Sequence, residues 1–206
     1  MIKHSGINDF FMKLSVTYLS MLCCVGFLLG PVELRAQRSS SVAAFALPGE
    51  FDGETVSLAS FSDNKAIVVA FTSYHCSWSV KYMDRLTQLY QEYHPRNVAF
   101  IAINSNDPEL EGELVRIAPP GFPFLKDADQ TVARDFGATR NPEAFVLIPA
   151  GAHFKIVYQG KIDDNPLDAR LVRHNFLQDA LDQILAGQNV HTRRTPASGC
   201  SIKGLD

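Results

Sequence analysis

Two uninterrupted apolar runs constrain the fold of this 206-residue chain more than any other feature. Residues 66–71 read AIVVAF and residues 98–103 read VAFIAI. Apolar runs of this length that are rich in β-branched residues are typical of strands buried on both faces of a sheet. Between them, apolar residues recur at helical spacing from Met83 to Tyr93, and Pro95 ends the pattern. A strand, a helix and a second strand in this order predict a right-handed parallel unit.

The flanking segments extend this unit into one α/β domain. Alternating apolar residues on either side of an Asp-Gly turn predict a hairpin within residues 45–58. Segments 144–148 and 154–158 are joined by too short a turn to be anything but antiparallel strands. Further helices are predicted at residues 108–117, 130–136 and 167–185. We therefore expect a mixed central sheet flanked by helices, with an N-terminal hairpin, a polar lead at 37–42 and a polar tail after Gly187.

Composition narrows the class of function. Hydrophobic residues make up 46% and charged residues 20% of the chain, which is typical of a globular protein. The formal net charge is −3, so no basic excess is present to neutralise a phosphate backbone. We expect no nucleic acid partner.

The N-terminus has the pattern of a signal peptide. Lys3 and Lys13 precede an uncharged run at residues 14–29, and we expect cleavage after Ala36. As a helix, this run would rise about 24 Å, less than the roughly 30 Å of a bilayer core. We therefore expect a leader at 1–36, a domain at 37–187 and a tail at 188–206, in an exported protein, periplasmic or extracellular. The alternative is an uncleaved anchor, which would be the chain's sole membrane contact.

Cysteine usage then becomes simple. Of four cysteines, Cys23 and Cys24 would leave with the leader, and Cys76 and Cys200 would remain. Two cysteines in an oxidising compartment are a candidate disulfide pair. Cys76 lies where the first buried strand gives way to the first helix, and the N–H groups of a helix N-terminus favour a thiolate.

Four motifs carry a resemblance to a known family. They are INSND at 103–107, NPEAF at 141–145, IDDNP at 162–166 and GCSIK at 199–203. Together with the order of elements and the place of Cys76, they resemble the bacterial redoxin group within the peroxiredoxin and thiol-specific antioxidant (AhpC/TSA) superfamily. The resemblance runs from about residue 45 to 203. It implies a thioredoxin-like fold and thiol-based oxidoreductase chemistry centred on Cys76, with no cofactor.

The redox loop departs from that pattern. Relatives usually carry Cys-x-His-Cys, whereas this chain has Ser73-Tyr74-His75-Cys76. The first cysteine of such a dithiol is the nucleophile that attacks a substrate disulfide, and a serine hydroxyl cannot replace it at neutral pH. This loop therefore lacks the attacking thiol of ordinary dithiol exchange.

Three interpretations of the two cysteines stay open. In the first, Ser73 and Cys76 match the spacing of a peroxidatic site, in which the serine hydroxyl would hydrogen-bond the Cys76 thiolate. Val69 stands where peroxiredoxins have a proline. Cys76 would then reduce a peroxide, Cys200 would resolve the sulfenic acid, and an external thiol would restore both. In the second, the pair is a structural bridge in a non-catalytic binding module. In the third, Cys76 alone forms mixed disulfides with protein thiols.

The resemblance also suggests residues that support the site. Pro142 matches the cis-proline that faces the redox cysteine, where an extended substrate segment can pair with the exposed backbone. The other candidates are Ser73, His75, Trp78, Arg140 and Asn141. Asp163 and Asp164 form an acidic pair, for which a capping role is favoured over metal binding. We expect no metal site, because His153, His174 and His191 show no ligand spacing with any cysteine.

Overall fold

The computed structural model describes residues 41–110 and 120–205. All of these residues belong to one compact unit. The predicted leader and most of the helix predicted at 108–117 lie outside the described residues. None of the described helices has the length and apolar character that crossing a bilayer requires.

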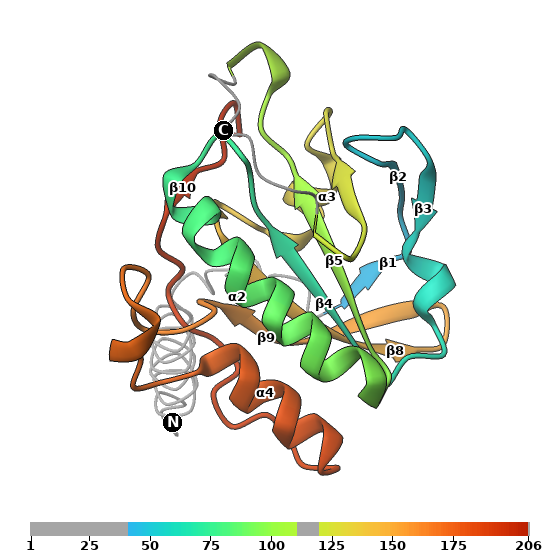
Figure 1. The fold of residues 1–206 in the computed structure, drawn as a ribbon. Helices are drawn as coiled ribbons and strands as arrows, with labels where there is room; N and C mark the ends of the chain where they lie inside the picture. The colour runs from blue at the N-terminus through green and yellow to red at the C-terminus, as the bar shows by residue number, and fades with distance from the viewer. Residues whose placement is uncertain (1–40, 111–119, 206) are drawn as a thin grey trace, which may run out of the picture. The chain divides into compact units, whose positions relative to one another are not determined.

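A six-stranded mixed sheet forms the centre of the domain (Figure 1). Across the sheet the strands are β1 (Ser41–Ala43), β9 (His153–Gly160), β8 (Glu143–Ala150), β4 (Ala66–Phe71), β5 (Val98–Asn104) and β6 (Phe124–Lys126). The two runs that are apolar throughout are β4 and β5, which pair in parallel at the centre. The pairs β4–β8 and β8–β9 are antiparallel. The short turn between β8 and β9 requires this direction for the second pair.

Helices cover both faces of this sheet, and alternate residues of β4 explain why. Ala66, Val68 and Ala70 face a core shared with α2 (Ser77–Tyr93) and α4 (Phe176–Leu185). Ile67, Val69 and Phe71 face a second core shared with α3 (Thr131–Phe136). Every side chain of β4 is therefore buried. The predicted α/β class, with a mixed sheet between helices, is confirmed.

Smaller elements complete the domain. The predicted hairpin is present as β2 (Ala46–Pro48) paired with β3 (Thr55–Ser57). A second two-stranded sheet joins β7 (Arg140–Asn141) to β10 (Cys200–Ser201). Single 3₁₀ turns are present at η1 (Leu58–Phe61), η2 (His94–Arg96), η3 (Pro108–Leu110) and η4 (Ala169–Leu171).

The prediction of one helix from 167 to 185 is wrong in its first half. Helix α4 begins only at Phe176, and Leu171, expected on its buried face, is 63% exposed. Short acidic side chains accept hydrogen bonds from backbone N–H groups in this segment, and those groups are then not available for helical hydrogen bonds. Asp168 accepts from the N–H of Arg170, and Asp164 accepts from those of Arg173 and His174. Such side chain to backbone bonds compete with helix formation.

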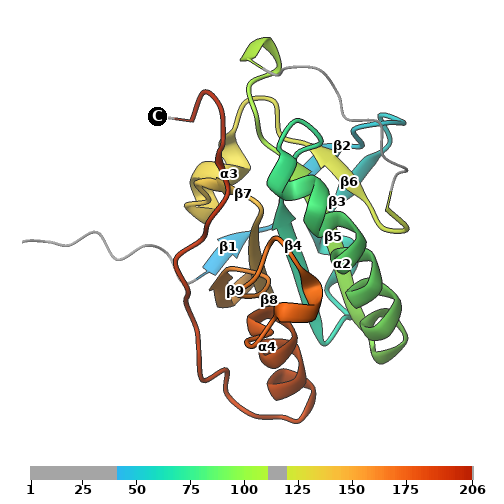
Figure 2. The same ribbon diagram turned by 60° about the vertical axis from the view of Figure 1, so that its left-hand side comes forward.

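Both ends of the domain, as far as the structure describes them, are more ordered than their polar sequences predict. Residues Ser41–Ala43 form the edge strand β1, and the side chain of Val42 is buried. In the tail, Ile202 is buried in the core that contains α3. Figure 2 shows the tail running from the end of α4 past α3. The tail is thus part of the folded domain.

Candidate redox site at the N-terminus of helix α2

Cys76 lies at the junction of the central strand and the first helix. It is the N-cap residue of α2, and its carbonyl accepts the first helical hydrogen bond, from the N–H of Val80 at 3.0 Å. The side chain makes no capping hydrogen bond and is only 2% exposed. In the reduced protein, the helix N-terminus would favour the thiolate, whereas burial would disfavour it.

Cys76 is bonded to Cys200, which confirms the predicted pair. The two residues are 124 positions apart in sequence, and their Cα atoms lie 6.1 Å apart. Strand β10 carries Cys200 to this place by pairing antiparallel with β7, which puts Cys200 opposite Asn141. The disulfide therefore fastens the tail at the edge of the redox loop.

The backbone around Asn141 forms the opposite wall of the site. The peptide bond between Asn141 and Pro142 is cis, as expected. The Asn141 carbonyl oxygen lies 3.2 Å from Cys76 Sγ. The bonded sulfur has no proton to donate, but the thiol of the reduced protein could donate to this oxygen. The buried carboxylate of Glu143 accepts the N–H groups of Thr139 and Arg140 and so fixes the turn before the cis bond.

In this disulfide-bonded structure the hydroxyl of Ser73 bonds within the redox loop and to Asn106. Its hydroxyl oxygen accepts the N–H of His75 at 3.0 Å and the side-chain amide of Asn106 at 2.9 Å. Both bonds hold the loop in shape. A direct bond from Ser73 to a Cys76 thiolate stays a prediction for the reduced state.

Asn106 connects the parts of the site, and sequence reasoning did not single it out. Its Nδ2 donates to Ser73, while its Oδ1 accepts from the side chain of Asn141 at 3.1 Å and from the N–H of Lys203 at 3.0 Å. The residue is buried, so these polar groups depend on one another. The available signal was its place in the INSND motif, at the carboxyl end of β5.

The remaining predicted residues contact the site less directly. Arg140 is exposed and donates from Nη1 to the hydroxyl of Ser201, so it contacts the tail. His75 contributes its backbone N–H to Ser73, and Trp78 lies in the first turn of α2 with 36% of its surface exposed. Roles for the His75 ring and for Trp78 stay predictions.

Buried polar atoms without a partner cluster around the redox loop. They are the hydroxyls of Thr72, Tyr74 and Ser79 and the side-chain carbonyl oxygen of Asn141. None of these four atoms has a hydrogen-bond partner within the described residues. Three of these residues lie within four positions of Cys76 in the chain. Burial, with the negative charge of Glu50, raises the pKa of Tyr74 to about 12, so its hydroxyl is protonated at neutral pH. The loop therefore has unused capacity to bond a small polar molecule.

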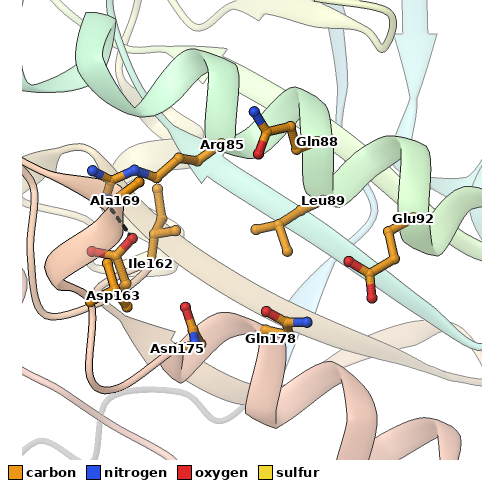
Figure 3. Close-up of a pocket in the computed structure, with 10 residues that line it drawn as sticks. Arg85, Gln88, Leu89, Glu92, Ile162, Asp163, Ala169, Asn175 and Gln178 are labelled. Atoms are coloured by element: carbon orange, nitrogen blue, oxygen red, sulfur yellow. Dashed lines mark hydrogen bonds and ion pairs between the residues drawn. The ribbon is translucent and has the colours of Figure 1, made fainter.

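The carboxylates of Asp163 and Asp164 hold the loop that precedes α4 through hydrogen bonds to its backbone. Asp163 is buried and accepts from the hydroxyl of Tyr82 at 2.7 Å and from Arg85 at 2.6 Å. Asp163 and Arg85 border a hollow of about 180 Å³ between α2 and α4 (Figure 3). The charge of Asp163 is already compensated by Arg85, and neither cysteine lines the hollow. Among the described residues, no three His, Cys, Asp or Glu side chains group as metal ligands.

Comparisons with solved structures show the same fold. A hypothetical protein from Sinorhizobium meliloti 1021 is 34% identical, with a TM-score of 0.71 over 81% of this chain and 93% of that chain. An uncharacterized conserved protein from Geobacillus kaustophilus is 30% identical, with a TM-score of 0.70 over 82% and 94%. The exposed lipoprotein thioredoxin of Streptococcus pneumoniae, at 18% identity and a TM-score of 0.50 over 68% and 99%, shares the fold alone.

The family follows from the sequence of the domain itself. A search of curated proteins gave no match. The model of the AhpC/TSA family matches residues 39–164, which is more than half of the chain and includes Cys76, Asn106 and the cis-proline turn. The predicted resemblance is therefore confirmed, and so is the expected thioredoxin-like fold. The chain belongs to the AhpC/TSA family, and with it to the thiol-based oxidoreductases.

Proposed function

We propose that this protein is an exported thiol peroxidase in which Cys76 reacts with peroxide and Cys200 resolves the product. The observation that carries the proposal is the bond between Cys200 and a cysteine at a helix N-terminus. A buried thiolate is accessible to a small oxidant but not to the disulfide of a folded protein. The site therefore favours a peroxide over a protein as the molecule that oxidises Cys76.

The first half of the cycle would consume one peroxide. The Cys76 thiolate attacks one peroxide oxygen, the O–O bond breaks, and the other oxygen leaves as an alkoxide or hydroxide. Cys76 becomes a sulfenic acid. The hydroxyls of Thr72, Tyr74 and Ser79 have no hydrogen-bond partner among the described residues and lie within four positions of Cys76 in the chain. In this proposal they bond the peroxide oxygens. The Cys200 thiolate then attacks the Cys76 sulfur, which forms the disulfide and releases hydroxide.

The second half of the cycle would need an external thiol reductant. Cys200 is partly exposed, whereas Cys76 is buried, so an incoming thiolate reaches the Cys200 sulfur first. The departing Cys76 thiolate is favoured by the helix N-terminus, which makes it the better leaving group. A second reductant thiol then frees Cys200, so two thiols are oxidised for each peroxide reduced.

Export and domain limits belong to the same proposal. The basic start and the short uncharged run at 14–29 support a cleaved leader at 1–36. The domain would then be residues 37–187, with the Cys200 tail at 188–206. An oxidising compartment is consistent with the Cys76–Cys200 bond. Mass spectrometry of protein recovered from the outer compartment should find Gln37 at the N-terminus.

A structural disulfide is the second candidate, because the tail makes many contacts of its own. Ile202 is buried, and β10 pairs with β7. In this alternative the domain would bind a protein without catalysis, and the bond would only hold the tail.

Peroxide treatment of the reduced protein separates the two candidates. We expect wild-type protein to lose two thiols per peroxide and to form the disulfide. The Cys200→Ser variant should stop at a Cys76 sulfenic acid, seen as one added oxygen and trapped by dimedone. The control is Cys76→Ser, in which Cys200 should react no faster than free cysteine. Reaction of wild-type Cys76 at the rate of free cysteine would contradict the proposal.

A further inference from the structure

We propose that the backbone N–H of Lys203, acting through the side chain of Asn106, directs the hydroxyl proton of Ser73 toward the Cys76 thiolate. Lys203 and Asn106 are then positioning residues for the redox cysteine. The inference rests on the proposed function, because it concerns the thiolate that attacks the peroxide. It gives the tail a second task, since the segment that supplies Cys200 would also prepare Cys76 for reaction.

The oxygen of Ser73 has both of its acceptor positions occupied. A serine hydroxyl can accept two hydrogen bonds and donate one. The Ser73 oxygen accepts from the N–H of His75 at 3.0 Å and from Nδ2 of Asn106 at 2.9 Å. Ser73 is fully buried, and no hydrogen bond among the described residues uses its proton. The hydroxyl proton therefore still needs an acceptor.

A tight turn joins Ser73 to Cys76, which supplies that acceptor when it is reduced. The N–H of Cys76 donates to the carbonyl of Ser73 at 3.3 Å and closes the turn. A thiolate at Cys76 has no proton of its own and accepts hydrogen bonds. A bond from the serine hydroxyl stabilises the charged form of the thiol and so lowers its pKa. This effect adds to that of the N-terminus of α2.

The N–H of Lys203 decides which end of the Asn106 amide faces the serine. A backbone N–H can only donate, so the Asn106 atom that lies 3.0 Å from it is the carbonyl oxygen Oδ1. Nδ2 then faces Ser73. The backbone of Asn106 is itself fixed, because its N–H donates to Oδ1 of Asn104 at 3.1 Å and its carbonyl accepts from Nζ of Lys126 at 3.2 Å.

Asn141 alone would not fix this orientation. Its Nδ2 donates to Oδ1 of Asn106 at 3.1 Å, while its own Oδ1 is buried without a partner among the described residues. If both amides turned over, Nδ2 of Asn106 would donate to Oδ1 of Asn141, so the two side chains would still share one bond. Oδ1 of Asn106 would then face Ser73 and accept the proton intended for Cys76. The N–H of Lys203 opposes this arrangement, because it would lose its acceptor.

The test compares Lys203→Pro with Lys203→Ala in full-length Cys200→Ser protein. Both variants lose the lysine side chain, but only proline lacks the backbone N–H. Gly204 follows with a φ of +76°, and proline is common before such a glycine in tight turns. The rate at which iodoacetamide alkylates Cys76 is measured between about pH 4 and pH 10, and its pH dependence gives the pKa of the thiol. Mass spectrometry of the peptide that contains Cys76 excludes the other cysteines.

We expect the Cys76 thiol to have a higher pKa in the proline variant than in the alanine variant. At a pH below both values its thiolate fraction should be about tenfold smaller, the size expected for one hydrogen bond to a charged group. The same two variants in a Ser73→Ala background are the control and should not differ, because the redirected proton is absent. Equal pKa values with Ser73 present would overturn the inference, and so would a difference that persists without its hydroxyl.

Charged and titratable groups on the elements around Cys76 are identical in the two variants. They are Tyr74 and His75 in the loop, Glu50 between β2 and β3, Asp107 after β5, Lys126 on β6, Arg140 on β7 and Glu143 on β8. The first turn of α2 carries no acidic residue. Their influence therefore cancels in the comparison of the two variants.

Asn106→Asp tests the same point if Lys203→Pro does not fold. A carboxylate has only acceptor oxygens, so this variant cannot donate to Ser73 and takes its proton instead. It should raise the pKa of the Cys76 thiol more with Ser73 present than in the Ser73→Ala background, where only the added negative charge acts. Equal rises in the two backgrounds would overturn the inference.

Peroxide treatment of the same Cys200→Ser proteins separates this inference from the proposed function. If peroxide oxidises Cys76 but the proline and alanine variants have the same thiol pKa, this inference fails alone. If peroxide oxidises Cys76 no faster than free cysteine, the proposed function fails, and the inference that rests on it fails as well.

Discussion

Reducing the Cys76–Cys200 bond should lower the free energy of unfolding by a predictable amount. The bond closes a loop of 124 residues in the unfolded chain. The chain-entropy relation for a loop of that length gives about 5 kcal/mol near room temperature, and removal of native disulfides typically costs about 2–5 kcal/mol. We expect the upper part of this range because β10, Ile202 and Asn106 keep the tail in place without the bond. The reduced native state then gains little freedom.

Guanidinium unfolding with and without dithiothreitol measures this difference. With a slope of about 5 kcal/mol per molar, a loss of about 5 kcal/mol moves the midpoint by roughly 1 M. The Cys200→Ser variant is the control, because reductant should not move its midpoint further. A change of less than about 1 kcal/mol on reduction of wild-type protein would refute the reasoning. It would mean that the tail leaves the domain when the bond opens.

Other predictions concern packing, ion pairs and pH. Ile202→Ala should lower the free energy of unfolding by about 2–4 kcal/mol in denaturant titration, and an effect below about 1 kcal/mol would contradict the burial of this side chain. Arg85→Ala should cost about 3 kcal/mol because it leaves Asp163 buried without its cation. Arg170→Ala removes an ion pair with Asp168 in which the arginine is 88% exposed, and it should lower the free energy of unfolding by less than about 1 kcal/mol. Equal losses for Arg85→Ala and Arg170→Ala would contradict the buried ion pair of Asp163. Burial raises the pKa of Tyr74 from 10.0 to about 12, so the unfolded chain loses this proton first as pH rises. The free energy of unfolding should therefore fall between about pH 10 and pH 12, and Tyr74→Phe should make this fall smaller. Identical pH profiles for wild type and Tyr74→Phe would contradict the raised pKa of Tyr74.

Much of the fold could be predicted from the sequence because its core strands carry strong patterns. The runs at 66–71 and 98–103 are apolar throughout, and both are central strands of the sheet. The first half of the predicted helix at 167–185 failed because Leu167 and Leu171 fit a helical period that local capping by Asp164 and Asp168 overrides. The spacing of apolar residues carries no information about such side chain to backbone hydrogen bonds.

Only those site residues whose side-chain type itself indicates a chemical role could be predicted from the sequence. Cys76, Cys200 and Pro142 could be singled out, because a thiol beside a helix start and a proline in a motif are visible in the sequence. Asn106 could not, because an amide shows its role only when its partners are placed. The path of the tail could not be predicted either. Apart from the disulfide, β10 is held by backbone hydrogen bonds and one buried isoleucine, and neither leaves a pattern in the sequence.

The equilibrium potential of the Cys76–Cys200 disulfide tests the central claim most directly. It is measured in glutathione and dithiothreitol buffers, with free thiols alkylated and counted by mass. A redox cycle through these two cysteines predicts a potential between about −120 and −270 mV, the range of working thiol oxidoreductases. A potential below about −300 mV would mark a structural bridge and would contradict the account.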